Sequence, residues 1–402
     1  MLRKDKFRNF ILGRFIFIMG LRMSGTVVAW WMYDLTHSAL ALGLLGLSEV
    51  VPALSFALYA GHYIDRNEKR KLLLRCVILY MCCMLLFYFV SDPFSTASHS
   101  PWRTASIVFS IIALTGAIRA FSGPTFASMI GQLVRREHLP TAASMSSATW
   151  LVASITGHAL GGFMIAWMGV HYTFLVILGL IIFGYFFLFQ LPLIPVVVRS
   201  KTAVWQSVRE GLSYVFKTKE ILGALTLDLF AVLFGGAVAL IPMFAKDVLH
   251  VGPEGFGWLN AASDIGSIIS VSLLTIAPLR RKQGKKLLLC VAGFGISIIF
   301  FALSTAFWIS FAMLMLSGLL DGVSMVVRGT ILQLKTPEEL RGRVMSVNSM
   351  FINSSNELGQ FESGIAAKWL GLVPSVIVGG SITVLVAIIT WFKAPGLREM
   401  EY

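Results

Sequence analysis

The sequence predicts an all-α membrane protein with twelve transmembrane helices in two pseudo-symmetric bundles of six. Composition, the lengths of the apolar runs and the placement of basic residues lead to this prediction. Of the 402 residues, 56% are hydrophobic and only 13% are charged, whereas soluble domains carry about 25% charged residues. A soluble protein of this length would need more polar surface. The composition therefore indicates a chain that crosses a membrane many times.

Twelve apolar runs are long enough to cross the hydrocarbon core, which takes roughly 20 helical residues. The first run is too long for a cleaved signal peptide and carries no small-residue cleavage site, so we expect it to remain as the first span. The predicted spans lie near residues 10–34, 40–63, 72–91, 103–133, 140–168, 171–192, 220–246, 255–279, 286–305, 307–335, 343–368 and 371–392.

Basic residues are distributed unevenly between the connections of these spans. If the N-terminus is cytoplasmic, 26 of the 33 Lys and Arg residues fall in inside segments and only three in outside segments. Since cytoplasmic loops are enriched in Lys and Arg, the sequence predicts that both termini lie in the cytoplasm. The net charge of +13 then requires no nucleic acid partner, because the basic face meets anionic lipid.

The longest predicted cytoplasmic connection, residues 193–219, divides the spans into six and six. Its apolar residues recur at helical spacing, which predicts an amphipathic helix on the inner interface. The predicted domains are an N-terminal bundle at 1–192, this linker, and a C-terminal bundle at 220–402. Weak echoes between the halves, such as GAIRAF at 116–121 and GLLDGV at 318–323, favour an internal duplication with a site between the repeats.

The segment GHYIDRNEKRK follows the second predicted span and resembles the inner loop of the major facilitator superfamily. The resemblance implies that this inner-gate loop latches the two halves on the inner side and switches during transport. A second copy is reduced to RRKQGKK at 280–286. The matching positions of the first copy are Gly61, Asp65, Arg66, Lys69, Arg70 and Lys71.

Longer segments, among them AIRAFSGPTFASMIGQLV and PEELRGRVMSVNSMFINSSNELGQFESG, resemble the superfamily branch of enterobactin exporters and macrolide efflux proteins. This resemblance implies proton-driven export of a bulky organic molecule across the cytoplasmic membrane. One motif departs from the pattern. Antiporters of the superfamily carry G-x-x-x-G-P-x-x-G-G in span five, whereas this chain has ASITGHALGG. Gly157, Gly161 and Gly162 remain for close helix packing, while Ala153 and His158 leave the direction of coupling open.

Charged and polar side chains inside the predicted spans are the candidate functional residues. An intramembrane charge costs at least roughly 2.5–3.5 kcal/mol, so each needs a partner, a wet cavity or a neutral protonation state. The proton-coupling candidates are Glu357, Glu49, Asp321 and Asp228. The candidates for a substrate cavity or gate are Arg22, Arg119, Asp321, Asn353 and Gln360.

Several of these candidates also have a purely structural interpretation. Arg22 and Glu49 lie on antiparallel neighbouring spans and could form a buried ion pair. Arg119 and Asp321 occupy matching repeat positions and could face each other as a gate, or Asp321 could pair with Arg328, two turns further along its own span.

Asp228 and His158 can each be interpreted as a structural or as a functional residue. Asp228 begins the seventh span near the inner surface, where it could be a solvated group or a partner of Lys217 or Lys219. His158 could be a satisfied packing residue or a group that titrates near neutral pH.

The eleventh predicted span contains the unusually polar stretch FINSSNELGQFESG. At 100° per residue, Asn353, Glu357 and Gln360 share a stripe within about 40°, while Glu362 points about 140° away from Glu357. We expect Glu357 to face the cavity or the second span and to exchange protons. Glu362 is expected to fix helix packing.

The sequence contains no nucleotide-binding P-loop, no zinc-ligand cluster and no serine nucleophile elbow. It therefore predicts neither an enzyme nor a cofactor or metal site. The predicted function is a monomeric secondary active exporter of the cytoplasmic (inner) membrane, whose partners are a small-molecule substrate, protons and membrane lipids. The alternatives are uptake or lipid transport on the same fold, and a membrane sensor without net transport.

Overall fold

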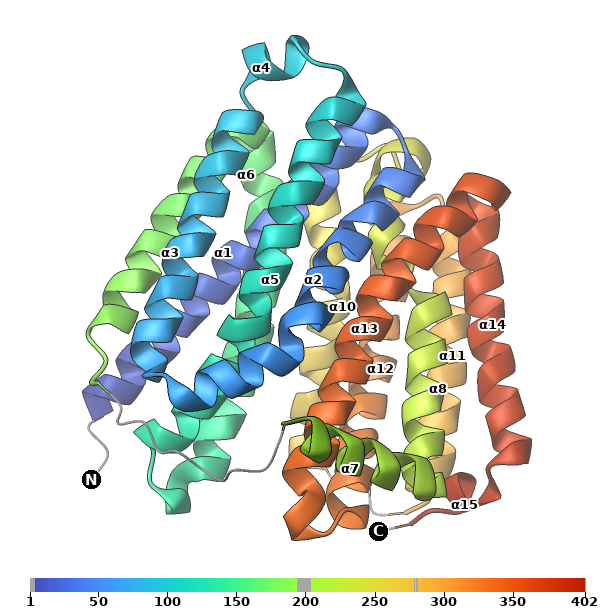
Figure 1. Ribbon diagram of the computed structural model, residues 1–402. Coiled ribbons are helices and arrows are strands. Elements are labelled where there is room, and N and C mark those ends of the chain that lie inside the picture. The colour runs from blue at the N-terminus through green and yellow to red at the C-terminus, as the bar shows by residue number, and fades with distance from the viewer. Residues whose placement is uncertain (1–3, 194–203, 278, 280, 402) are drawn as a thin grey trace. The chain divides into compact units, whose positions relative to one another are not determined.

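Helices account for nearly all of the chain in the computed structural model, which describes residues 4–193, 204–277, 279 and 281–401 (Figure 1). Within this part of the chain there are no β-strands. Among the described residues, ten helices are long and apolar enough to cross a membrane, judged by length and composition. The predicted all-α class is therefore confirmed.

Two of the twelve predicted spans are also helical but are not counted separately among these ten helices. Helix α6 (Leu139–Phe189) covers two predicted spans. Its helical assignment continues across Gly169, where φ of 75° and ψ of 172° break the regular helix. Helix α13 (Glu338–Leu370) has the required length, but its many polar residues keep it outside the ten apolar helices.

The helices gather into two compact units, each of which is described here by itself. Unit 1 comprises Met1–His37, Ser48–Lys201 and Gly252–Ala261. Unit 2 comprises Ser38–Leu47, Thr202–Val251 and Ala262–Tyr402. The first turns of α2 (Ala39–Arg66) therefore group with unit 2, and the first turns of α10 (Pro253–Ile276) group with unit 1.

Unit 1 is built on four long helices that lie side by side in Figure 1. Buried aromatic side chains fill the space between them: the rings of Phe17 and Tyr80 lie 5.3 Å apart, and those of Phe87 and Phe174 lie 5.1 Å apart. These separations are typical of stabilising aromatic pairs. The helices are α1 (Lys4–Thr36), α3 (Lys69–Val90), α5 (Pro101–Leu133) and α6, with the short α4 (Pro93–Ala97) and η1 (Arg136–His138) between them.

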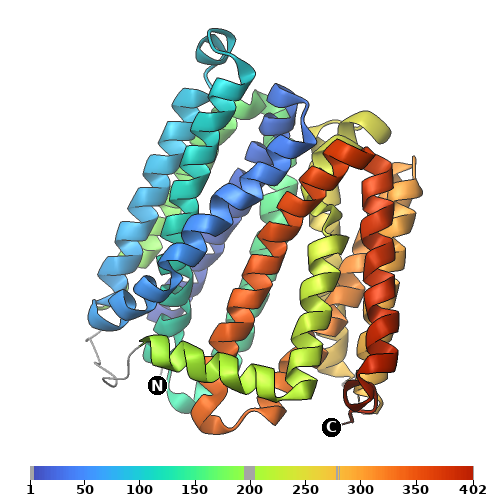
Figure 2. The same cartoon turned by 45° about the vertical axis from the view of Figure 1, so that its right-hand side comes forward.

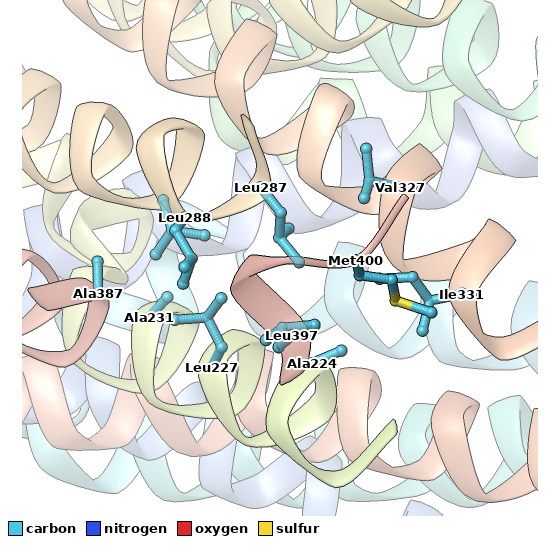
Figure 3. Close-up of a cluster of buried hydrophobic side chains, with 11 residues drawn as sticks. Ala224, Leu227, Ala231, Leu287, Leu288, Val327, Ile331, Ala387, Leu397 and Met400 are labelled. Carbon is cyan, nitrogen blue, oxygen red and sulfur yellow. The ribbon is translucent and has the colours of Figure 1, made fainter. Parts of the chain in front are cut away.

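Unit 2 has an apolar core between α8, α11, α12 and α14 (Figure 3). Leu397 and Met400, from the segment that follows α14, insert among side chains of α8 and α12 and complete this core. The elements of the unit are α7 (Val204–Lys217), α8 (Lys219–Gly235), η2 (Ala237–Leu240), α9 (Ile241–Met243), η3 (Phe244–Val248), α11 (Gln283–Leu303), α12 (Phe307–Lys335), α13, α14 (Leu372–Lys393) and α15 (Pro395–Arg398).

Helix α7 runs across the ends of α8 and α13 rather than along them (Figure 2). Val215 is buried in a cluster with Ile221 and Leu225, which ties α7 to α8. Arg343 of α13 forms an ion pair with Glu210 of α7. Residues 194–203 of the predicted linker, and the side chains of 204–208, lie outside the described part of the structure.

Helices α10 and α12 cross within unit 2 at backbone contact. A Cβ added at Gly318 would overlap the carbonyl oxygen of Ser263, and one added at Gly266 would overlap that of Met315. The Ser267 hydroxyl donates to the Gly318 carbonyl at 3.0 Å. Small residues and interhelical hydroxyl bonds are the usual means of holding helices together in a membrane, where burial away from water gives no driving force between them.

We predict that Gly318→Ala lowers the free energy of unfolding by about 1–3 kcal/mol, since the added methyl group forces the two backbones apart. Gly329→Ala is the matched control on the same helix, because no atom lies within 4 Å of a Cβ added there. The measurement is unfolding of the purified protein in detergent. Equal stability of the two variants would contradict the proposed role of the crossing.

Candidate functional site

Arg328 of α12 lies between two carboxylates inside unit 2. Its Nη1 atom forms an ion pair with Asp228 of α8, and its Nη2 atom lies 3.7 Å from Oδ1 of Asp321. Asp321 precedes Arg328 by seven residues on α12, so two helical turns place the two side chains on one face. We call Asp228, Asp321 and Arg328 the charged triad.

The three members of the charged triad differ sharply in exposure. The side chains of Arg328 and Asp228 are only 7% and 8% exposed, whereas that of Asp321 is 43% exposed. Leu227 and Val327, the chain neighbours of Asp228 and Arg328, belong to the apolar core of unit 2. A buried ion pair is strongly coupled, and Asp321 is the partly exposed member of the triad.

The charges of the triad do not balance when both carboxyl groups are ionised. One guanidinium cannot neutralise two carboxylates, and a net charge in an apolar interior is costly. Binding of one proton removes this excess.

The structure corrects the sequence-based interpretation of Asp228. It is buried and paired with Arg328, rather than solvated or paired with Lys217 or Lys219. Arg328 is the residue missing from the predicted site, although the sequence carried a signal for it as a basic residue inside an apolar span. The alternative pairing of Asp321 with Arg328 is confirmed at 3.7 Å.

In unit 1, Glu49 of α2 pairs with Arg119 of α5 at 2.7 Å. Both side chains are partly exposed, at 31% and 41%. Gly116 allows the approach, because a Cβ there would overlap the Glu49 carbonyl. The Arg22 guanidinium lies 4.7 Å from the centroid of the Trp150 ring. The pairing of Glu49 with Arg22 remains a prediction.

The glycines of the span-five motif bring α6 against its neighbours in unit 1. A Cβ at Gly157 would lie 2.6 Å from Cβ of Arg22, and one at Gly161 would lie 3.1 Å from Cβ of Thr26. Gly162 meets the Pro253 carbonyl of α10 in the same way. His158 lies among them, with Nδ1 2.9 Å from the Thr26 hydroxyl. This contact supports the packing interpretation of His158.

The polar stretch of α13 packs against the first turns of α2 within unit 2. A Cβ added at Gly46 would lie 2.9 Å from Cβ of Gln360, and one at Gly43 would lie 3.1 Å from Cα of Gly364. Glu357 is 5% exposed, so it is buried beside this contact rather than open. Glu362 is half-buried, and the side chain of Asn353 lies outside the described part of the structure.

The predicted inner-gate loop is a tight connection between α2, which ends at Arg66, and α3. Glu68 caps α3 by accepting from the backbone N–H groups of Arg70 and Lys71 at 3.1 and 2.7 Å. The Arg70 side chain donates to the Phe189 carbonyl at the end of α6.

Gly61 and Asp65 also belong to the predicted inner-gate loop. A Cβ added at Gly61 would meet no atom within 4 Å. The side chain of Asp65 lies outside the described part of the structure. The role of the loop as a switch remains a prediction. Among the described residues, no group of three His, Cys, Asp or Glu side chains is placed to hold a metal ion.

The family model of the Major Facilitator Superfamily matches residues 10–360 of the chain. The chain is 25% identical over 408 aligned residues to the enterobactin exporter EntS of Citrobacter koseri, which covers 98% of this chain and 93% of the relative. It is 23% identical over 390 residues to an uncharacterised transporter of the same superfamily, YfmI of Bacillus subtilis, with 93% of both chains covered.

Solved structures with the same fold include the nucleoside transporter NupG, at a TM-score of 0.79 and 12% identity over 96% of this chain and 100% of that one. A D-xylose–proton symporter matches with a TM-score of 0.73 and 13% identity over the full length of both chains. At this level of identity the likeness concerns the fold alone.

We predict that Arg328→Met lowers the free energy of unfolding by about 3–5 kcal/mol, because it leaves the Asp228 carboxylate buried without its cation. The double variant Arg328→Met/Asp228→Leu should recover most of this loss, since it removes both buried charges. The measurement is a denaturant titration in detergent.

Lys335→Met serves as the control for this series. Lys335 lies 3.6 Å from Glu220 with both side chains partly exposed, so its loss should cost no more than about 1 kcal/mol. A double variant as unstable as Arg328→Met would show that the buried pair is not the source of the effect.

Proposed function

The chain belongs to the major facilitator superfamily, and on this premise we propose that it exports bulky organic molecules across the cytoplasmic membrane in exchange for protons. The observation that carries the direction of transport is similarity to enterobactin exporters over nearly the whole chain. We therefore place the substrate among siderophores, macrolides and compounds of similar size.

The charged triad supports proton coupling. Asp321 is partly exposed and shares Arg328 with a buried carboxylate, so one proton can bind there and leave a neutral group. In the deprotonated state Arg328 is attracted by both carboxylates, and in the protonated state it is held by Asp228 alone. Protonation of Asp321 therefore weakens its attraction to Arg328, two turns further along α12, and leaves Arg328 paired with Asp228 of α8.

Coupling follows if the two conformations of the transporter differ in their affinity for the proton. A ligand shifts a conformational equilibrium only by its differential affinity for the two states. The excess negative charge is most costly where the triad is sealed from water, so a sealed state favours protonated Asp321. An open, hydrated state tolerates the ionised form, from which the proton is released.

The basic residues support an orientation for this exporter. With both termini in the cytoplasm, 26 Lys and Arg residues lie on the inner side and three on the outer side. The inner-gate loop at 61–71 then faces the cytoplasm. We place the protein in the cytoplasmic (inner) membrane as a monomer.

We predict that Asp321→Asn abolishes transport driven by a pH gradient but leaves exchange of substrate down its own gradient. The amide resembles the protonated carboxyl group and cannot cycle. The measurement uses proteoliposomes with a lumen two pH units more acidic than the medium, offered enterobactin, erythromycin or tetraphenylphosphonium. Exchange of one proton for one substrate without net charge movement would supply about 2.7 kcal/mol, which is up to about 100-fold accumulation.

The same assay separates the alternatives. Antiport accumulates substrate when the lumen is acidic, whereas uptake by symport does so when the medium is acidic. Movement of none of the compounds under either gradient would refute active export of these substrate classes. Glu338→Gln is the control, since that side chain is 86% exposed at the start of α13. If Asp321→Asn accumulates substrate as well as this control does, Asp321 is not the coupling group.

A further inference from the structure

Four aromatic side chains meet where the second half of α2 lies against α5 in unit 1 (Figure 1). Phe121 of α5 is at the centre, with its ring centroid 6.4 Å from Phe56, 6.2 Å from Tyr59 and 5.9 Å from Tyr63. The rings of Tyr59 and Tyr63 are stacked 6.0 Å apart. We call these four residues the aromatic patch.

The aromatic patch is not part of the buried core. Phe56 is 44% exposed and Tyr59 is 58% exposed, which leaves their rings available to another molecule. An exposed ring on a membrane helix faces either lipid tails or a water-filled space. The aromatic rings alone do not distinguish these two environments.

The neighbouring charges favour an aqueous environment. Glu49 precedes Phe56 by seven residues on α2, so both project from the same face of the helix. The Glu49–Arg119 pair is 31% and 41% exposed, and partly exposed charges within a span, even when paired, usually face a water-filled cavity rather than lipid tails. We therefore expect the face of α2 that carries Phe56 to be in contact with water.

A second aromatic pair in unit 1 shows the opposite situation. Phe183 and Phe187 of α6 lie 5.2 Å apart, and Phe183 is 54% exposed. The sequence from His171 to Gln190 contains no Lys, Arg, Asp or Glu. An apolar surface of this kind is typical of contact with lipid, so Phe183 provides a matched comparison.

We propose that the aromatic patch binds an aromatic ring of the transported molecule, beside the Glu49–Arg119 pair; this inference rests on the proposed transport function. Tyr59 and Phe56 offer exposed ring surfaces already held at stacking distances by Phe121 and Tyr63. Because these rings are already packed, binding a further ring costs little side-chain conformational freedom. The ion pair lies about two turns from Phe56 along α2, so it can hydrogen-bond polar groups elsewhere on a bulky molecule whose ring binds the patch.

The first experiment tests whether the patch is wet, without any need for transport. Ser55 is exposed one residue from Phe56, so Ser55→Cys places a thiol beside the patch and leaves all four rings intact. The variant is made with Cys76, Cys82, Cys83 and Cys290 replaced by alanine, and is treated in lipid nanodiscs with a water-soluble maleimide. We expect labelling of Ser55→Cys and little labelling of Ile182→Cys on α6, where the native side chain is 39% exposed.

The second experiment tests recognition of aromatic rings. Tetraphenylphosphonium and tetrabutylphosphonium have the same charge and similar size but differ in aromatic character, and their binding to the purified protein is measured by calorimetry. We expect the wild type to prefer tetraphenylphosphonium, and Tyr59→Leu and Phe121→Leu each to reduce this preference about three- to ten-fold. Tyr59→Phe should retain it, because the ring remains, and Phe183→Leu should leave it unchanged.

The outcomes separate this proposal from the proposed function. Unreactive Ser55→Cys would show that the patch faces lipid and would overturn the proposal even if export is demonstrated. Absence of a preference for tetraphenylphosphonium in the wild type, or an equal loss in Phe183→Leu, would also overturn it. Labelling and aromatic preference without accumulation in proteoliposomes would support the patch and count against active export.

Discussion

The guanidinium of Arg328 is the interaction on which the organisation of unit 2 depends. It joins α8 to α12 through Asp228 and holds Asp321 two turns away on its own helix. In an apolar interior such a pair is weak evidence for net stability, because the cost of desolvation can exceed the attraction between the charges. Its presence fits the role proposed for the triad, in which the interactions of Arg328 change when Asp321 binds a proton. The burial of Arg328 and Asp228 would make that change energetically significant.

Close backbone contacts provide the rigid frame around these charges. At the crossing of α10 with α12, and where α13 meets the first turns of α2, glycines remove the side chains that would hold the helices apart. Hydroxyl groups such as that of Ser267 then reach the carbonyl of the neighbouring helix. Helices packed in this way cannot easily separate by small amounts. In the proposed transport cycle, changes in the charged triad would therefore move whole helices.

The spans could be predicted from sequence because hydropathy and length are local properties. Even Gly169, which ends one span inside α6, is a local signal. Partners of buried charges could not be predicted in the same way, since Glu49 lies 70 positions from Arg119 and Asp228 lies 100 positions from Arg328. The sequence placed Arg22 and Glu49 on neighbouring antiparallel spans but did not give the direction of their side chains. The pairing of Asp321 with Arg328 was accessible because both lie on one helix.

The two groups of intramembrane charges differ in net charge, and this difference supports the roles proposed for the two units. Glu49 and Arg119 pair one anion with one cation, so adding a proton to Glu49 would remove the attraction between them. The charged triad has one carboxylate in excess, and adding a proton brings it to neutrality. Taken by itself, the triad is brought to neutrality by one proton, whereas the pair is not. This difference supports the proposal that unit 2 responds to the proton, while the pair in unit 1 keeps a polar surface for substrate.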